Sequence, residues 1–265
     1  MDNEYKSSLL FRTDAWLVVG ILFILMLVCI AIGSAWSKKQ KAKFEYYDNP
    51  ANNTVYGAVF ALLAFLLAFT FSMSGNRYDA RRQATIAEAN AIGTAILRTD
   101  LYPDSDRIVF RSDLKNYLQA RIDNITAGAD ITKQIKADKQ ASLYALRLWG
   151  HALQFSQKNP SVIISGQMIP ALNEMFDDAT TNTYSERMRV PESIVIMLFI
   201  LLLISAFFIG YISVGKGRFD WFTGAGFCLL SALVLFITLD LDRPRRGLIQ
   251  LDTSHQAIIS LMDQF

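Results

Sequence analysis

The chain lacks the residue patterns that mark redox, metal-binding and catalytic proteins. Its two cysteines, Cys29 and Cys228, both lie in apolar stretches, and no CxxC or CxxH spacing occurs, so we expect neither a disulfide nor a zinc site. The two histidines, His151 and His255, stand alone, and no nucleotide-binding loop, GxSxG or HExxH motif is present. We therefore expect no enzymatic activity, no cofactor and no metal.

The chain also has no large excess of positive or negative charge. The 26 lysines and arginines nearly balance the 24 acidic residues, which leaves a net charge of +2, so nothing indicates a nucleic-acid partner. In contrast, apolar residues are abundant, at 52% of the chain with a mean hydropathy of +0.25. They concentrate in four uncharged runs of about 19 to 21 residues, a length typical of membrane-spanning helices: Ala15–Ala35, Val55–Met73, Ser193–Ser213 and Trp221–Leu239.

These runs predict an all-α integral membrane protein with four spans in a 2+2 arrangement around a helical soluble insert. The expected segments are an N-terminal tail (1–14), two spans (15–73), the insert (74–189), two further spans (190–239) and a C-terminal segment (240–265). An even number of spans places both termini and the insert on one side. Ten lysines and arginines near span ends on that side against six on the other favour the cytoplasm.

The second apolar run continues without a strong helix breaker into a charged stretch, so one helix is expected from Thr54 to Arg98. Its 45 residues would span roughly 65–70 Å, about twice the thickness of a hydrocarbon core. A helix of this kind can carry an ion path, a conformational signal or only mechanical support. No run has an ionisable residue at its centre, which disfavours a coupled transporter.

Helical spacing divides this helix into two opposite faces. One face carries small residues that allow close packing against a neighbouring helix, namely Gly57, Ala61, Ala64 and Ala68. The other changes from apolar to hydroxyl to charged along Val59, Leu63, Leu66, Thr70, Ser74, Arg77, Arg81 and Glu88, and Asn90 belongs to a second polar stripe. The second face could line a pore, with Arg77, Arg81 and Arg82 attracting anions. Alternatively, the arginines anchor the span at lipid headgroups.

Two further polar clusters lie outside the spans. Asn173, Glu174 and Asp177 form either a solvated acidic face or partners for the arginines of the long helix. A second cluster follows the last span directly and suggests a tight turn at the membrane surface, with a cation site on its two carboxylates as the alternative: Asp240, Asp242, Arg243 and Pro244.

Four stretches of the sequence together resemble the bestrophin-like membrane protein family of bacteria. They are the Arg-Tyr-Asp-Ala-Arg-Arg and Glu-Ala-Asn-Ala-Ile-Gly-Thr stretches at 77–82 and 88–94, the Leu-Asn-Glu-Met-Phe-Asp stretch at 172–177, and Asp-Leu-Asp-Arg-Pro at 240–244 with Gly247. The resemblance covers about Val55 to Leu251. It implies distant similarity to bestrophins, which are pentameric anion channels with four spans per subunit and a pore lined by the second span.

The leading hypothesis is therefore a homo-oligomeric channel in a bacterial inner membrane that conducts inorganic anions such as chloride. Its pore would be lined by the helix Thr54–Arg98, and a pentamer is implied by the resemblance alone. Four spans leave little room for a pore within one subunit, so conduction requires several chains around an axis. The alternative is a non-conducting adaptor or stress sensor whose insert binds a partner protein.

Overall fold

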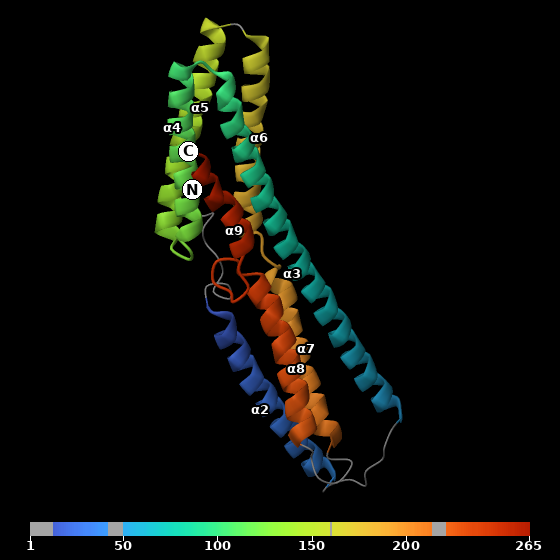
Figure 1. Cartoon of the computed structure of the whole chain (residues 1–265). Helices are drawn as coiled ribbons and strands as arrows, with labels where there is room; N and C mark the ends of the chain where they lie inside the picture. The colour runs from blue at the N-terminus through green and yellow to red at the C-terminus, as the bar shows by residue number, and fades with distance from the viewer. Residues whose placement is uncertain (1–12, 42–49, 160, 214–220) are drawn as a thin grey trace. The chain divides into compact units, whose positions relative to one another are not determined.

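The computed structural model of the chain describes residues 13–41, 50–159, 161–213 and 221–265 (Figure 1). Within these ranges the protein is helical and contains no strand. Four helices are long and apolar enough to cross a membrane, which confirms the number of predicted spans: α2 (Ala15–Lys41), α3 (Pro50–Arg98), α7 (Glu192–Ser213) and α8 (Trp221–Leu241). Most of the predicted N-terminal tail (1–14) and the loop at 214–220 lie outside the described residues.

Contacts divide the chain into two compact units. The first contains the part of the chain up to Asn76 together with Arg189–Arg243, and the second contains Arg77–Met188 with Pro244–Phe265. The division therefore falls within α3, which continues through it as one helix. The contact boundaries, unlike the boundaries expected from the apolar runs, assign the C-terminal segment to the same unit as the insert.

In the first unit, α2 packs along both α7 and α8 (Figure 1). Two glycines allow the backbones of α2 and α7 to touch. A Cβ atom built on Gly33 would lie 2.2 Å from the carbonyl oxygen of Phe207, and one built on Gly210 would lie 2.1 Å from that of Ile30. The small residues that fasten this bundle are therefore on α2 and α7, where close approach gives helices in lipid their main contact.

The outer surface of the first unit is apolar. Large hydrophobic side chains such as Ile21, Ile24 and Leu229 are exposed, as expected of side chains that face lipid. Trp16 and Trp36 are exposed near the two ends of α2. They stand 20 positions apart, about 30 Å along a helix, which matches a hydrocarbon core bordered by aromatic residues at both interfaces.

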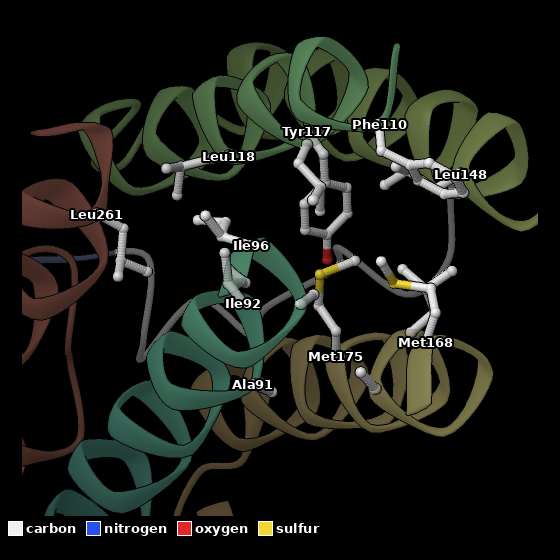
Figure 2. Packing of buried hydrophobic residues seen from close by; sticks show 14 of the residues in the cluster. Ala91, Ile92, Ile96, Phe110, Tyr117, Leu118, Leu148, Met168, Met175 and Leu261 are labelled. Atoms are coloured by element: carbon white, nitrogen blue, oxygen red, sulfur yellow. The ribbon is translucent and has the colours of Figure 1, made fainter. Parts of the chain in front are cut away.

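The second unit surrounds the aqueous part of α3 with helices that were expected in the insert. They are η1 (Thr99–Leu101), α4 (Asp104–Thr126), α5 (Ile131–Lys158) and α6 (Val162–Arg187), followed after the last span by α9 (Asp252–Ile259) and η3 (Ser260–Gln264). Its core brings Ile92 and Ile96 of α3 toward Leu118 of α4 and Met175 of α6 (Figure 2). Leu261 of η3 belongs to the same core, so the C-terminal segment helps to close it.

Local sequence signals define the turn between α4 and α5. Gly128 adopts a left-handed backbone conformation with φ = 53°, which glycine tolerates without a steric penalty. The Asp130 side chain then accepts hydrogen bonds from the backbone N–H groups of Thr132 and Lys133, so it satisfies two free donors at the start of α5.

We predict that Gly33→Ala and Gly210→Ala each destabilise the helix bundle by about 1–3 kcal/mol, the usual penalty for overpacking. The added methyl group meets backbone atoms, which cannot turn away as a flexible side chain does. Thermal unfolding of the detergent-solubilised protein measures the effect. Gly20→Ala on the same α2 is the matched control, because a Cβ there has nothing within 4 Å. Equal stability of Gly33→Ala and Gly20→Ala would contradict the close approach.

Candidate functional site: the faces of the long helix and a buried polar network

Within a single chain, α3 covers the face that was predicted to line a pore and exposes the face that was predicted to pack against another helix. Side chains of the predicted pore-lining face are buried at Leu63, Thr70, Ser74, Arg81 and Glu88 and half-buried at Val59, Leu66 and Arg77. Leu63 belongs to the core of the first unit, and Thr70 donates its hydroxyl proton to the carbonyl oxygen of Leu66 at 2.7 Å. These side chains are therefore covered by their own chain, and the five buried ones are not available to line a path between chains.

The small-residue face of α3 is exposed in the described part of the chain at all four predicted positions, Gly57, Ala61, Ala64 and Ala68. Further toward the C-terminus of α3, the same side of the helix exposes Ser72, Asp79, Gln83 and Asn90, and Arg82 lies exposed beside them. Residue spacing correctly grouped the side chains into faces. Spacing alone does not say which face the chain itself covers, because both a small-residue stripe and an apolar stripe can pack against a helix. Within one chain the covered face is the predicted pore-lining one, and packing of the small-residue face against another chain stays a prediction.

Glu88 is the most enclosed charged group on α3. Its carboxylate accepts hydrogen bonds from Nε of Arg121 at 2.5 Å and from the terminal nitrogen Nη2 of the same guanidinium at 2.9 Å. Asn182 of α6 donates a third hydrogen bond at 2.6 Å, and Thr85 donates to Asn182 at 3.1 Å. One carboxylate thus joins α3 to α4 and α6 through donors that compensate its loss of water.

The Arg121 guanidinium remains charged despite its burial. Burial lowers the pKa of Arg121, but the Glu88 carboxylate, with smaller contributions from Tyr117 and Asp138, raises it by more, and the net effect is an increase. Nearby Tyr117 has a raised pKa mainly because it is buried. Arg121 therefore keeps its positive charge and serves as a structural tie between α4 and α3.

Arg81 lies one turn beyond the division between the two units and is occupied by backbone carbonyls. Its Nε donates to the carbonyl oxygen of Ser185 at 3.2 Å, and a terminal nitrogen donates to that of Met188 at 2.7 Å. These groups belong to the end of α6, where helix carbonyls lack intrahelical partners. Arg81 therefore caps α6, in place of the predicted role at the mouth of a pore.

A second group of contacts extends the network to the segment after the last span. Arg245 donates to Glu186 of α6 at 2.9 Å and to both the carbonyl oxygen and the side-chain oxygen of Asn124 at 2.7 and 2.6 Å. Asn124 in turn donates to Asp138 of α5 at 2.7 Å, and Asp138 lies 3.6 Å from Arg121. The polar groups around Glu88 and those around Arg245 are therefore continuous.

His255 of α9 borders this network, with its Nε2 atom 3.9 Å from a carboxylate oxygen of Glu186. Its pKa is lowered, first because burial disfavours the charged imidazole, and in part because Arg245 lies nearby. The carboxylates of Glu186, Asp252 and Glu88 oppose that change without reversing it. The folded protein therefore favours neutral His255 at neutral pH.

The predicted acidic cluster of α6 faces solvent. Asn173, Glu174 and Asp177 are all exposed, which agrees with the solvated alternative. The neighbouring Asp178 has a raised pKa, chiefly because of partial burial and then because of the Glu174 charge. Arg81, which had been considered as a partner for this cluster, donates instead to the end of α6.

The cluster after the last span is buried, with Asp240, Asp242, Arg243 and Pro244 all enclosed. Asp242 accepts a hydrogen bond from the backbone N–H of Val190 at 2.6 Å, and the N–H of Arg243 donates to the carbonyl oxygen of Asp240 at 2.9 Å, which closes a turn. No group of three or more potential metal ligands occurs in the part of the chain that the structure describes. Asp242 thus fixes the chain at the start of α7.

Sequence reasoning missed most partners in the network: Thr85, Arg121, Asn124, Asp138, Asn182, Glu186 and Arg245. One signal was available for Arg121. It falls on the apolar spacing of α4 between Leu118 and Ile125, and an arginine on a buried helix face requires an acidic partner. The other partners come from distant parts of the sequence, and no local pattern connects them.

The chain matches the Bestrophin-like domain over residues 20–255. Crystal structures of a bacterial bestrophin homolog from Klebsiella pneumoniae share its fold. A variant with one tryptophan replaced by alanine aligns with a TM-score of 0.70 at 13% identity, covering 95% of this chain and 99% of that chain. The structure phased with zinc aligns with a TM-score of 0.69 at 14% identity, covering 92% and 98%. No curated protein matches the chain in sequence.

We predict that Arg121→Met destabilises the protein by about 3–5 kcal/mol, because it leaves the Glu88 carboxylate buried without its cation. The double variant Glu88→Leu with Arg121→Met should recover a large part of this loss. Arg107→Met is the matched control, since its pair with Asp104 is exposed and should contribute less than about 1 kcal/mol. Chemical unfolding in detergent measures all three. A loss for Arg121→Met no larger than for Arg107→Met would refute the assigned role.

We also predict that acid weakens the fold through His255. The pKa in the folded state is below the ordinary value of 6.5, so the unfolded chain binds the proton more readily. The stabilising contribution is complete above pH 6.5 and disappears as the pH falls through the folded pKa. Melting temperatures measured from pH 7.5 to 5 should therefore fall less steeply in His255→Gln than in the natural protein. An equally steep fall in His255→Gln and in the natural protein would contradict this assignment.

Proposed function

Because the chain belongs to the Bestrophin-like domain family, we propose that it is a homo-oligomeric ion channel whose path runs along the exposed face of α3. The family consists of channel-like proteins, and four membrane-length helices together with the shared fold are consistent with this class. Fold alone does not determine function.

The observation that supports a path is the exposed side of α3 itself. In the membrane half this side carries Gly57, Ala61, Ala64 and Ala68, and it becomes polar at Ser72, Asp79, Gln83 and Asn90 without interruption of the helix. In the membrane half, the small residues favour close contact with another helix, and the polar residues beyond the span require water or another chain beside them. Several copies around an axis would supply both, and closed rotational symmetry is the common solution.

The proposed path differs from the path expected from sequence. Leu63, Thr70, Ser74, Arg81 and Glu88 are removed from it, because their own chain covers them. The small residues of α3 take their place, either at the path or at the close contact between neighbouring copies of α3. Both roles need short side chains, since a narrow ring of helices leaves little space at its centre.

We further propose that the permeant ions are anions. At the point where α3 leaves its apolar segment, two arginines, half-buried Arg77 and exposed Arg82, are near in sequence to one exposed acid, Asp79. The excess is one positive charge per chain, and an assembly multiplies it around the axis, where it raises the local anion concentration. Arg81 adds little, because carbonyl oxygens occupy its guanidinium. Chloride is the simplest ion of this class.

The proposed location is a bacterial inner membrane, with both termini and the insert in the cytoplasm. The excess of lysine and arginine near the span ends on that side supports this orientation. Exposed apolar side chains of α2 and α8, such as Ile24 and Leu230, would then contact lipid. The number of subunits is proposed as five by analogy with bestrophins.

Ion selectivity in planar bilayers tests the proposal. The purified protein should conduct, and under a potassium chloride gradient its reversal potential should lie toward the chloride equilibrium potential. Arg82→Glu should move the reversal potential toward cations by tens of millivolts, since it changes two charges per subunit at an exposed position. Asp79→Asn should move it the opposite way. Glu174→Gln is the matched control, because its charge is equally exposed but lies on α6.

The possible outcomes separate the parts of the proposal. Silent bilayers over a range of voltage, pH and calcium, together with a stoichiometric second protein retained in mild detergent, would favour the adaptor. Conduction with a natural preference for cations would overturn the anion assignment alone. Conduction that neither Arg82→Glu nor Asp79→Asn alters would remove the exposed face of α3 from the path.

A further inference from the structure

A cavity of about 320 Å³ opens between α4, α5 and α6, entirely within the second unit. Aromatic rings of Tyr117, Phe176 and Tyr184 contribute to its walls. Ala141 and Ala145 of α5 also line it, and their side chains are short. The volume lies at the lower end of the range for small-molecule sites, about 300–1,000 Å³. A compact ligand with an apolar part would therefore fit.

Charged groups of both signs border the same cavity. Asp138 stands 3.7 Å from a terminal nitrogen of Arg187 and 3.6 Å from one of Arg121. Arg121 also holds Glu88 through two hydrogen bonds. Asp138 thus compensates Arg187 within the lining, and Glu88, which lies outside the lining, compensates Arg121, so the site has no net charge. A ligand with a single charge would leave one charge uncompensated in a half-enclosed place, which is unfavourable.

Three hydroxyl groups in the lining act as hydrogen-bond acceptors toward a ligand. Ser142 donates its proton to the carbonyl oxygen of Asp138 at 2.9 Å. Thr180 and Thr183 donate theirs to the carbonyl oxygens of Phe176 and Ala179, each at 2.8 Å. Because each proton is already directed at the preceding turn of its own helix, these oxygen atoms offer lone pairs only. Together with Asp138, they favour a ligand that donates several hydrogen bonds, such as an ammonium group.

We propose that this cavity binds a zwitterionic α-amino acid with an apolar side chain. The ligand carboxylate faces Arg187, which is partly exposed at 29% of its side chain, and a guanidinium matches a carboxylate in charge and shape. The ligand ammonium group faces Asp138 and the hydroxyl oxygens. The apolar side chain lies against Tyr117 and Phe176. In this arrangement every charge on the ligand has an opposite charge beside it, and the neutrality of the site is kept.

The proposal goes beyond ion conduction, and it holds whether or not the chain conducts. It has a structural connection to α3, since Arg121 borders the cavity and also holds Glu88. The test therefore measures binding alone and requires no current. Failure of the bilayer experiment would leave the cavity assignment untouched, and the reverse is also true.

Isothermal titration calorimetry on the full-length protein in detergent provides the test. The probes are L-phenylalanine and L-leucine, with 2-phenylethylamine and 3-phenylpropanoate as analogues of phenylalanine that lack one charged group each. We expect at least one amino acid to bind, and the corresponding single-charge analogues of phenylalanine to bind at least tenfold more weakly. Arg187→Gln should weaken binding at least tenfold, and Ala145→Phe should abolish it by filling the space.

Arg147→Gln is the matched control, since Arg147 lies on α5 and outside the lining of this cavity. It should bind the amino acid as the natural protein does. Melting temperatures within two or three degrees of the natural value show that each variant is folded, and Ala141→Leu replaces Ala145→Phe if the latter is not. Absence of binding by both amino acids overturns the proposal. So does equal binding of 3-phenylpropanoate or 2-phenylethylamine and phenylalanine, or unchanged binding after the cavity is filled.

Discussion

The second unit depends on one buried ion pair, between Glu88 of the long helix and Arg121 of α4. Two charges removed from water are unfavourable unless each finds well-placed partners. Here the carboxylate has two guanidinium hydrogen bonds and a third from Asn182. A buried pair of this kind adds orientation more than stability, because only one rotation of α3 brings Glu88 to Arg121. That rotation also determines which side of α3 its own chain leaves uncovered.

The fold could be predicted from sequence to the level of its helices. Uncharged runs of span length identified the four membrane helices, because hydrocarbon tolerates little else. The absence of a breaker between Thr54 and Arg98 identified the long helix, which the structure begins at Pro50. These signals are local. Each rests on residues adjacent in sequence, so no knowledge of tertiary contacts was needed.

The candidate site was less predictable because its residues acquire their roles from distant segments. Gly57 and Ala61 suggested helix packing, yet the glycines in tight backbone contact are Gly33 and Gly210 on other helices. Arg81 suggested a pore mouth, but the end of α6 lies beside it and takes its hydrogen bonds. Asp240 and Asp242 suggested a tight turn at the membrane surface or a cation site, and the structure has a turn in which Asp242 is buried against the backbone of Val190. In each case the residue type was read correctly and its neighbour could not be known.

The unbroken course of α3 has a mechanical consequence. A continuous run of helical hydrogen bonds resists twisting, so a small turn of one half of α3 about the helix axis is passed along to the other half. Two contacts hold the aqueous half of α3 at different positions along its length. Glu88 pairs with Arg121 of α4, and Arg81 donates to the end of α6. Any event that loosens these two attachments would let the helix rotate about its own axis. It would change the side chains presented inside the membrane from a point well outside it.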